Sequence, residues 1–177
     1  MSTLRAPRNR TLTLSDVERD EYSRSLLRLQ SPVETVPENS IIHGDIFSTL
    51  PHLPASFADL LFLDPPYNLR RQFGENSFQE MPVSEYGIWF ESWFKPLLVK
   101  CRPSASVYVC CDWRSSGTIH GILEKHLIVR NRITWEREKG RGALKNWKNC
   151  LEDIFYCTMS DEFQFDLEKV KIKKRVI

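Results

Sequence analysis

An apolar run that stops at two prolines constrains the fold of this chain most strongly. Residues 58–63, Ala-Asp-Leu-Leu-Phe-Leu, form a typical buried strand, and Asp64, Pro65 and Pro66 follow it directly. Two prolines cannot continue a central strand, because each lacks the backbone N–H that the strand ladder needs. The carboxylate of Asp64 is therefore expected at the end of a strand, held rigidly at one edge of a sheet.

Strand and helix signals alternate from Ile41 onward, which is typical of an α/β domain with a largely parallel sheet. Apolar periodicity predicts helices at 84–100 and 115–126, and strands at 41–43, 58–63, 106–111, 127–135 and 153–158. The last strand is expected to complete an antiparallel hairpin at the sheet edge. Residues 39–177 are predicted to form this domain.

The first 38 residues are polar and are expected to form an N-terminal extension. Thr13 and Ser15 are the two candidate caps of a helix that runs to about Gln30. With 177 residues, of which 41% are hydrophobic and 27% charged, the chain has enough apolar side chains for one sizeable core.

The composition favours neither a membrane protein nor a metalloprotein. No run of about 18 apolar residues occurs, and the N-terminus carries no hydrophobic segment, which indicates a cytoplasmic protein without a membrane span. The five cysteines form no C-x-x-C pair and the four histidines show no ligand spacing, so no metal site is predicted. The formal net charge is +2, and nucleic-acid binding would therefore depend on local basic clusters.

Asp64-Pro65-Pro66-Tyr67, placed directly after a hydrophobic strand, resembles the catalytic motif of the amino-methyltransferases that act on DNA bases. The exocyclic amine of adenine is a poor nucleophile, because its lone pair is delocalised into the ring. The Asp64 carboxylate and the Pro65 carbonyl can accept its two hydrogens and turn the lone pair toward the methyl group of S-adenosylmethionine. Tyr67 is expected to stack on the base after it has been flipped out of the duplex.

The resemblance also implies a cofactor site. Gly44 and Asp45 lie about twenty residues upstream of the motif, after the expected strand 41–43, and Asn68 follows Tyr67. The family pattern implies that Asp45 binds the adenosyl amine of S-adenosylmethionine, that Ile46 lies beside its adenine, and that Asp64 reaches toward its ammonium. For Asp45 alone, capping of a helix is an equally good interpretation.

A second block, residues 131–142 with 146–149 and 152–156, is similar to the segment that shapes the target-base pocket in beta-type N6-adenine methyltransferases. Gly140 and Gly142 permit a close backbone approach. Cations cluster in the same segment and are predicted, with Asn68, to contact DNA: Arg137, Lys139, Arg141, Lys145 and Lys148. A solvated hairpin loop is the alternative interpretation.

The resemblance leaves one part of the family's pattern unmatched. Family members carry a glycine-rich, Phe-x-Gly-x-Gly-type cofactor loop toward the C-terminus, whereas the last glycine in this chain is Gly142. The expected fold is thus a Rossmann-like S-adenosylmethionine-dependent methyltransferase fold that is incomplete within this chain.

Two hypotheses about function follow. In the first, the chain is one subunit of a split DNA adenine-N6 methyltransferase, a bacterial or phage enzyme of restriction-modification type that works at the nucleoid. A complementary polypeptide would then form a heterodimer with it and supply the glycine-rich loop and the target-recognition segment. In the second, the chain is a non-catalytic DNA-binding or regulatory remnant. Methylation of cytosine N4 stays an alternative chemistry, although that group tends to place serine where Asp64 stands.

Overall fold

The computed structural model of the chain describes residues 13–73, 76–141, 145 and 147–171. The chain divides into two compact units, Met1–Leu53 and Pro54–Ile177. The domain boundary that the sequence suggested after residue 38 therefore falls inside the first unit. No helix in the described residues is long and apolar enough to cross a membrane.

In the first unit, helix α1 (Asp16–Arg24) begins at a capping box. The backbone N–H of Glu18 donates to Ser15 Oγ at 3.3 Å, and the backbone N–H of Ser15 donates to the Glu18 carboxylate at 2.8 Å. Of the two candidate caps, Thr13 and Ser15, the structure uses Ser15. The predicted extension of this helix to about Gln30 is wrong, because the helix ends at Arg24.

Leu27 explains why the helix stops and why residues 41–43 form no strand. Its N–H donates to the carbonyl of Ile41, and its carbonyl accepts from the N–H of His43, both at 2.9 Å. Since these groups are taken by another segment, they cannot join a helix that runs through Leu27. The predicted strand 41–43 is wrong for the same reason, because this isolated bridge to Leu27 gives it no ladder. Helix α2 (Ile46–Thr49) and the 3₁₀ helix η1 (Leu50–His52) follow.

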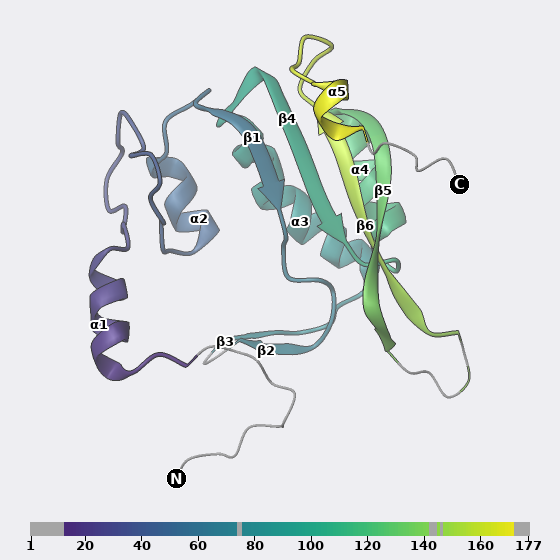
Figure 1. Cartoon of the computed structure of the whole chain (residues 1–177), viewed down its shortest axis with the longest axis horizontal. Coiled ribbons are helices and arrows are strands. Elements are labelled where there is room, and N and C mark those ends of the chain that lie inside the picture. Colours follow the sequence, from purple (N-terminus) through teal and green to yellow (C-terminus); the bar gives the residue numbers. More distant parts are fainter. Residues whose placement is uncertain (1–12, 74–75, 142–144, 146, 172–177) are drawn as a thin grey trace. The chain divides into compact units, whose positions relative to one another are not determined.

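The second unit is built on a four-stranded sheet of order β1-β4-β6-β5 (Figure 1). Its strands are β1 (Ala58–Leu63), β4 (Cys101–Cys111), β5 (Ile128–Arg141) and β6 (Asn149–Thr158). The bounds predicted for β1 are confirmed, and so is the antiparallel hairpin, formed by β5 and β6 at the edge. Only β1 and β4 pair in parallel here, so the expectation of a largely parallel sheet is wrong for the described residues. A hairpin necessarily returns β6 antiparallel to β5.

Helices α3 (Val83–Leu98) and α4 (Ser116–His126) lie on one face of this sheet (Figure 1), close to their predicted bounds. Tyr86, Phe90 and Phe94 recur every four residues along α3 and are fully buried. Alternate residues of β4, among them Val107 and Val109, are buried as well, so the core lies between the helices and the sheet. A small hairpin of β2 (Arg71–Phe73) and β3 (Asn76–Phe78) precedes α3, and α5 (Leu167–Val170) follows the sheet.

Candidate active site

The topology brings three distant segments together at one end of the strands. Because β1 and β4 are parallel, their carboxyl ends lie side by side, and Leu63 lies opposite Val109. Strand β6 runs the other way, so its first half lies at the same end, with Ile154 paired to Cys110. Asp64, which follows Leu63 directly, therefore lies at the place where β4 ends and β6 begins.

The turn after β1 is held by side chains from outside it. The hydroxyl of Tyr86, a fully buried residue of α3, donates to the Pro66 carbonyl at 3.0 Å. Asn68 donates from Nδ2 to the Met81 carbonyl at 2.7 Å and accepts from the Met81 N–H at 2.9 Å. These bonds fix the backbone on both sides of Tyr67.

Asn68 therefore occupies a different environment from the one its predicted DNA contact suggests. Asn68 is only 6% exposed, and both polar atoms of its side-chain amide are hydrogen-bonded to the backbone of Met81. In this structure Asn68 anchors the turn. The DNA contact assigned to it stays a prediction.

The Tyr67 hydroxyl lies near two carboxylates. It donates to Glu152 Oε2 at 3.3 Å, and Glu152 belongs to β6, 85 positions further along the chain. Burial, above all, and then the negative charges of Asp64 and Glu152 raise the pKa of Tyr67 well above its usual range. Tyr67 is therefore a neutral phenol at physiological pH, able to donate its proton and to offer an uncharged ring.

Cys110 on β4 borders the same two carboxylates. Burial, followed by the charges of Asp64 and Glu152, raises the pKa of this thiol to about 11. A thiol with such a pKa is protonated near neutral pH, and the thiolate is the form that attacks carbon. Cys110 thus lines the site as a neutral group and is not a nucleophile.

Glu152 is itself held by a cation of the neighbouring strand. Arg137 of β5 places Nη1 2.6 Å from Glu152 Oε1, and the Glu152 side chain is only 13% exposed. The Nε atom of Arg137 is buried and has no hydrogen-bond partner among the described residues. The sequence suggested DNA phosphate as the partner of Arg137, whereas the structure pairs it inside the site.

The structure describes the side chains of two of the other four predicted cations. Lys145 and Lys148 are exposed between β5 and β6. Lys139 and Arg141 belong to β5 by their backbone, and their side chains lie outside the described residues. DNA binding by these four residues stays a prediction.

Asp45 caps helix α2 in the first unit. Its Oδ1 accepts from the N–H groups of Phe47 at 2.9 Å and Ser48 at 3.4 Å, so the interpretation as a helix cap is confirmed. Ile46 is the first residue of that helix. The cofactor contacts assigned to Asp45 and Ile46 stay predictions.

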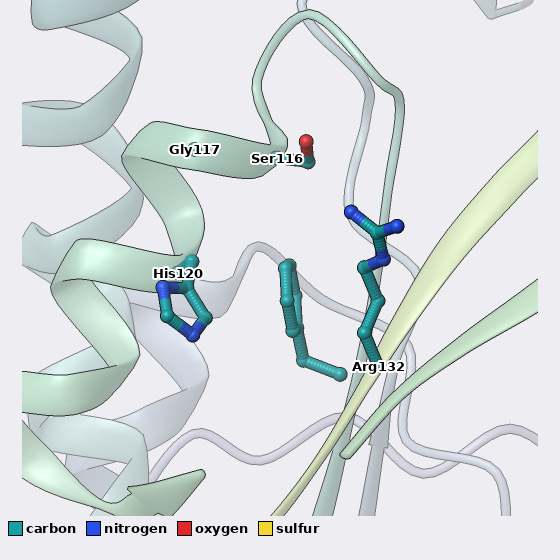
Figure 2. A pocket seen from close by; sticks show the side chains of 5 residues that line it. Ser116, Gly117, His120 and Arg132 are labelled. Carbon is teal, nitrogen blue, oxygen red and sulfur yellow. The ribbon is translucent and has the colours of Figure 1, made fainter.

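A separate cavity of about 370 Å³ lies beside the N-terminus of α4 (Figure 2). It is lined by Ser116, Gly117, His120, Arg132 and Phe155. Since successive residues of a strand point to opposite faces, Phe155 faces the helices, whereas Glu152 lies on the other face. The cavity is thus distinct from the Asp64 turn. No cluster of three or more potential metal ligands occurs in the part of the chain that the structure describes.

Glu152, Cys110 and Tyr86 were not identified from the sequence. Glu152 stands in a segment that the resemblance covered, but nothing near it in the chain indicates a tyrosine partner 85 positions away. Its alternation with Ile154 and Tyr156 assigns it to one face of β6, and only the strand order then brings it to Asp64.

The four-stranded sheet with helices on one face corresponds to part of the Rossmann-like fold of the S-adenosylmethionine-dependent methyltransferases, which a solved DNA methyltransferase shares. Within this class, the model of the DNA methylase family for N6 and N4 amino groups matches residues 58–176. The chain belongs to this family.

Individual relatives agree with this assignment. The chain is 23% identical over 141 residues to the type II methyltransferase M.HpaI of Haemophilus parainfluenzae, covering 78% of this chain and 45% of the relative. It is 28% identical over 120 residues to the DNA adenine methyltransferase YhdJ of Escherichia coli (strain K12), covering 65% and 39%. The solved PvuII DNA methyltransferase (cytosine-N4-specific) superposes with a TM-score of 0.61 at 16% identity, covering 74% and 52%, which shows a shared fold. The chain thus spans less than half the length of these two curated relatives.

Proposed function

We propose that this chain carries the catalytic half of a site-specific DNA methyltransferase that transfers a methyl group from S-adenosylmethionine to N6 of a flipped-out adenine in duplex DNA. The observation that carries the proposal is the Asp64 turn, held by Tyr86 and Asn68, with a neutral Tyr67 beside the carboxylate. A turn fixed in this way can orient a weakly nucleophilic amine.

The chain's own residues suit this chemistry. The Asp64 carboxylate and the Pro65 carbonyl accept the two amine hydrogens, and the negative charge of Asp64 favours the positive charge that develops on nitrogen. Pro66 keeps the turn extended, and its carbonyl is occupied by Tyr86. The Tyr67 ring stacks on the flipped base. The proton of the methylated amine then leaves to water.

The carboxylate acceptors of the chain suit part of S-adenosylmethionine. Bound to this enzyme, the cofactor would supply an electrophilic methyl group, and it offers hydrogen-bond donors at its adenine amine and its ammonium. Asp64 provides a carboxylate acceptor for the ammonium. The family resemblance assigns the adenine amine to Asp45 of the first unit, with Ile46 beside the adenine ring. A glycine-rich turn for the carboxylate end is not found among the described residues, and no glycine follows Gly142 in the sequence.

We propose that a complementary polypeptide supplies that turn. Among the described strands, β1 pairs on one side only, with β4, although its apolar sequence is that of a strand buried on both faces. Leu60 and Phe62 of β1 are 60% and 59% exposed. A partner strand beside β1, with its flanking helix, would bury both the edge and these side chains.

The choice of adenine rests on two supports. The turn carries aspartate where cytosine-N4 enzymes of the resembling group tend to place serine. The E. coli relative is named a DNA adenine methyltransferase. The cytosine-N4-specific PvuII structure, at 16% identity, supports the fold and does not bear on the base.

The test is the modified base itself. The chain is co-expressed with candidate partners in a host that lacks DNA methylation. The nucleosides of the digested DNA are then separated by chromatography and identified by mass spectrometry. N6-methyladenine supports the proposal, and N4-methylcytosine would replace adenine by cytosine as the target. A complex that binds DNA and the cofactor but leaves both bases unmodified would favour the non-catalytic alternative.

A further inference from the structure

The Tyr67 hydroxyl has one proton and two neighbouring carboxylates. Its oxygen lies 3.3 Å from Glu152 Oε2 and donates there, and the Asp64 side chain also acts on it, both through its charge and as a competing hydrogen-bond acceptor. A phenol can donate its proton to only one acceptor at a time. The acceptor that holds this proton decides how much of the Asp64 carboxylate is left for another donor.

Glu152 is well placed to be that acceptor. Arg137 Nη1 lies 2.6 Å from its other carboxylate oxygen, and the side chains of Glu152 and Arg137 are 13% and 32% exposed. An ion pair that is largely shielded from water holds its members in one geometry more firmly than an exposed pair does. The ion pair thus keeps the Glu152 carboxylate directed toward Tyr67.

We propose that Glu152 is a positioning residue: held by Arg137, it accepts the hydroxyl proton of Tyr67 and so leaves the Asp64 carboxylate free for the amine of the target base. This role rests on the proposed function only for the identity of the amine. The contact between Tyr67 and Glu152 lies within this chain and does not depend on the reaction that the chain takes part in.

The inference has a direct consequence for a chain without Glu152. The Tyr67 proton would then turn to Asp64, the remaining carboxylate nearby, since a half-buried hydroxyl without an acceptor is costly. Asp64 would lose part of its capacity to accept the amine, and the Tyr67 ring would tilt away from its stacking position. Arg137 would also lose its carboxylate partner.

Tyrosine labelled with ¹³C at Cζ tests the contact in the full 177-residue chain, without methyl transfer. The Cζ resonance reports the hydrogen bond of the phenol oxygen, and Tyr67→Phe assigns the signal among the five tyrosines. We expect Glu152→Ala to move the Tyr67 signal. Asp64→Ala should then move it further in the Glu152→Ala chain than in the wild-type chain, because there Asp64 no longer competes with Glu152 for the proton.

Two variants control this measurement. Glu136→Ala removes the same charge from an exposed position of β5, next to Arg137 in sequence, and should leave the Tyr67 signal in place. Glu152→Gln keeps the shape and an acceptor oxygen, and should move the signal less than alanine does. A Tyr67 signal that responds to Glu152→Ala no more than to Glu136→Ala would overturn the proposal.

Kinetics of the assembled enzyme test the consequence. Glu152→Ala should lower kcat about tenfold, the effect of one hydrogen bond, with most of the activity retained in Glu152→Gln. In the Tyr67→Phe background the same substitution should change kcat less than about twofold, since no hydroxyl is left to compete for Asp64. Equal losses in both backgrounds would indicate a merely structural Glu152. An assembled wild-type enzyme that methylates no DNA refutes the proposed function, whereas these comparisons refute only the role of Glu152.

Discussion

The chemistry proposed for this chain depends on a single charge at the end of β1. Asp64 combines an acceptor for an amine hydrogen with a negative charge beside the nitrogen that becomes positive. Asparagine keeps an acceptor oxygen and loses that charge, so the two properties can be separated by substitution. The backbone of the turn is held through Pro66 and Asn68, so replacing Asp64 by alanine or by asparagine should change the side chain and leave the backbone in place.

Asp64→Ala in the assembled enzyme should lower methyl transfer by several orders of magnitude and leave DNA binding largely intact. Loss of one preorganised interaction with a developing charge typically costs about 10²- to 10³-fold, and Asp64→Asn should fall in or near this range. Transfer of tritium from labelled S-adenosylmethionine to DNA measures the rate, with a filter-binding assay for DNA affinity. Near-normal turnover by the alanine variant would remove Asp64 from the mechanism.

The basic hairpin separates into two kinds of cation. Arg137 is bound to Glu152, whereas Lys145 and Lys148 are exposed to solvent. Of these three described side chains, Lys145 and Lys148 are the ones open to solvent and accessible to phosphate. Charge reversal at Arg137 would also disturb the site, so it is a poor probe of DNA binding.

Lys145→Glu with Lys148→Glu should weaken DNA binding and make it less sensitive to salt. Each lost phosphate contact lowers the slope of log affinity against log salt by about 0.9, so the pair should lower it by about 2. Fluorescence anisotropy across a salt series gives the slope. Lys95→Glu, exposed in the last turn of α3, is the matched control. An unchanged slope in the double variant would identify the segment as an ordinary solvated hairpin.

At the scale of the elements, α3 does more than cover the sheet. Tyr86 is buried on the same side of this helix as Phe90 and Phe94, and its hydroxyl donates to the Pro66 carbonyl. The helix that stabilises the core therefore also sets the position of the turn. Stability and geometry of the site are linked through one hydrogen bond.

Tyr86→Phe should destabilise the chain by about 1–3 kcal/mol, because the Pro66 carbonyl then loses its donor in a half-buried place. Urea unfolding, followed by circular dichroism, measures the change in the free energy of unfolding. Tyr22→Phe, in the exposed helix α1, removes a hydroxyl from a tyrosine that is 54% exposed and should have almost no effect. Equal stability of the two variants would show that the Tyr86 bond contributes nothing to the fold.

Sequence patterns predicted those elements whose signals are local. The strand of residues 58–63 was predicted with its exact ends because its apolar run meets two prolines, and Ser15 was predicted because capping involves neighbours. Residues 41–43 have the composition of a strand but find a bridge only to Leu27, which composition does not reveal. Glu152 could not be predicted, because its contact with Tyr67 depends on strand order and register.

On the scale of the whole molecule, one face of the sheet is covered by α3 and α4, and the other carries aromatic side chains as well as Glu152. On that other face Phe62, Tyr108 and Tyr156 stack in a row across β1, β4 and β6, with ring centroids 6.1 Å and 4.8 Å apart. Phe165 covers the far end of the row at Tyr156, which is 6% exposed, whereas Phe62 at the β1 end is 59% exposed. The exposed end adjoins the open edge of β1. The edge and the aromatic row together form a surface suited to a second polypeptide.

The isolated chain should therefore bind S-adenosylmethionine weakly or not at all and gain affinity and activity only with its complementary polypeptide. The proposed contact of Asp64 with the ammonium of the cofactor covers one end of it, and the sequence of residues 1–177 contains no Phe-x-Gly-x-Gly-type turn for its carboxylate. A partner that covers the β1 edge and Phe62 should bury about 2,000 Å² or more, as obligate interfaces do. Calorimetry with S-adenosylmethionine compares the single chain with the co-purified pair, and the Phe62→Ser chain tests whether the aromatic face holds the pair together. Tight cofactor binding and DNA methylation by the purified 177-residue chain alone would refute the split enzyme.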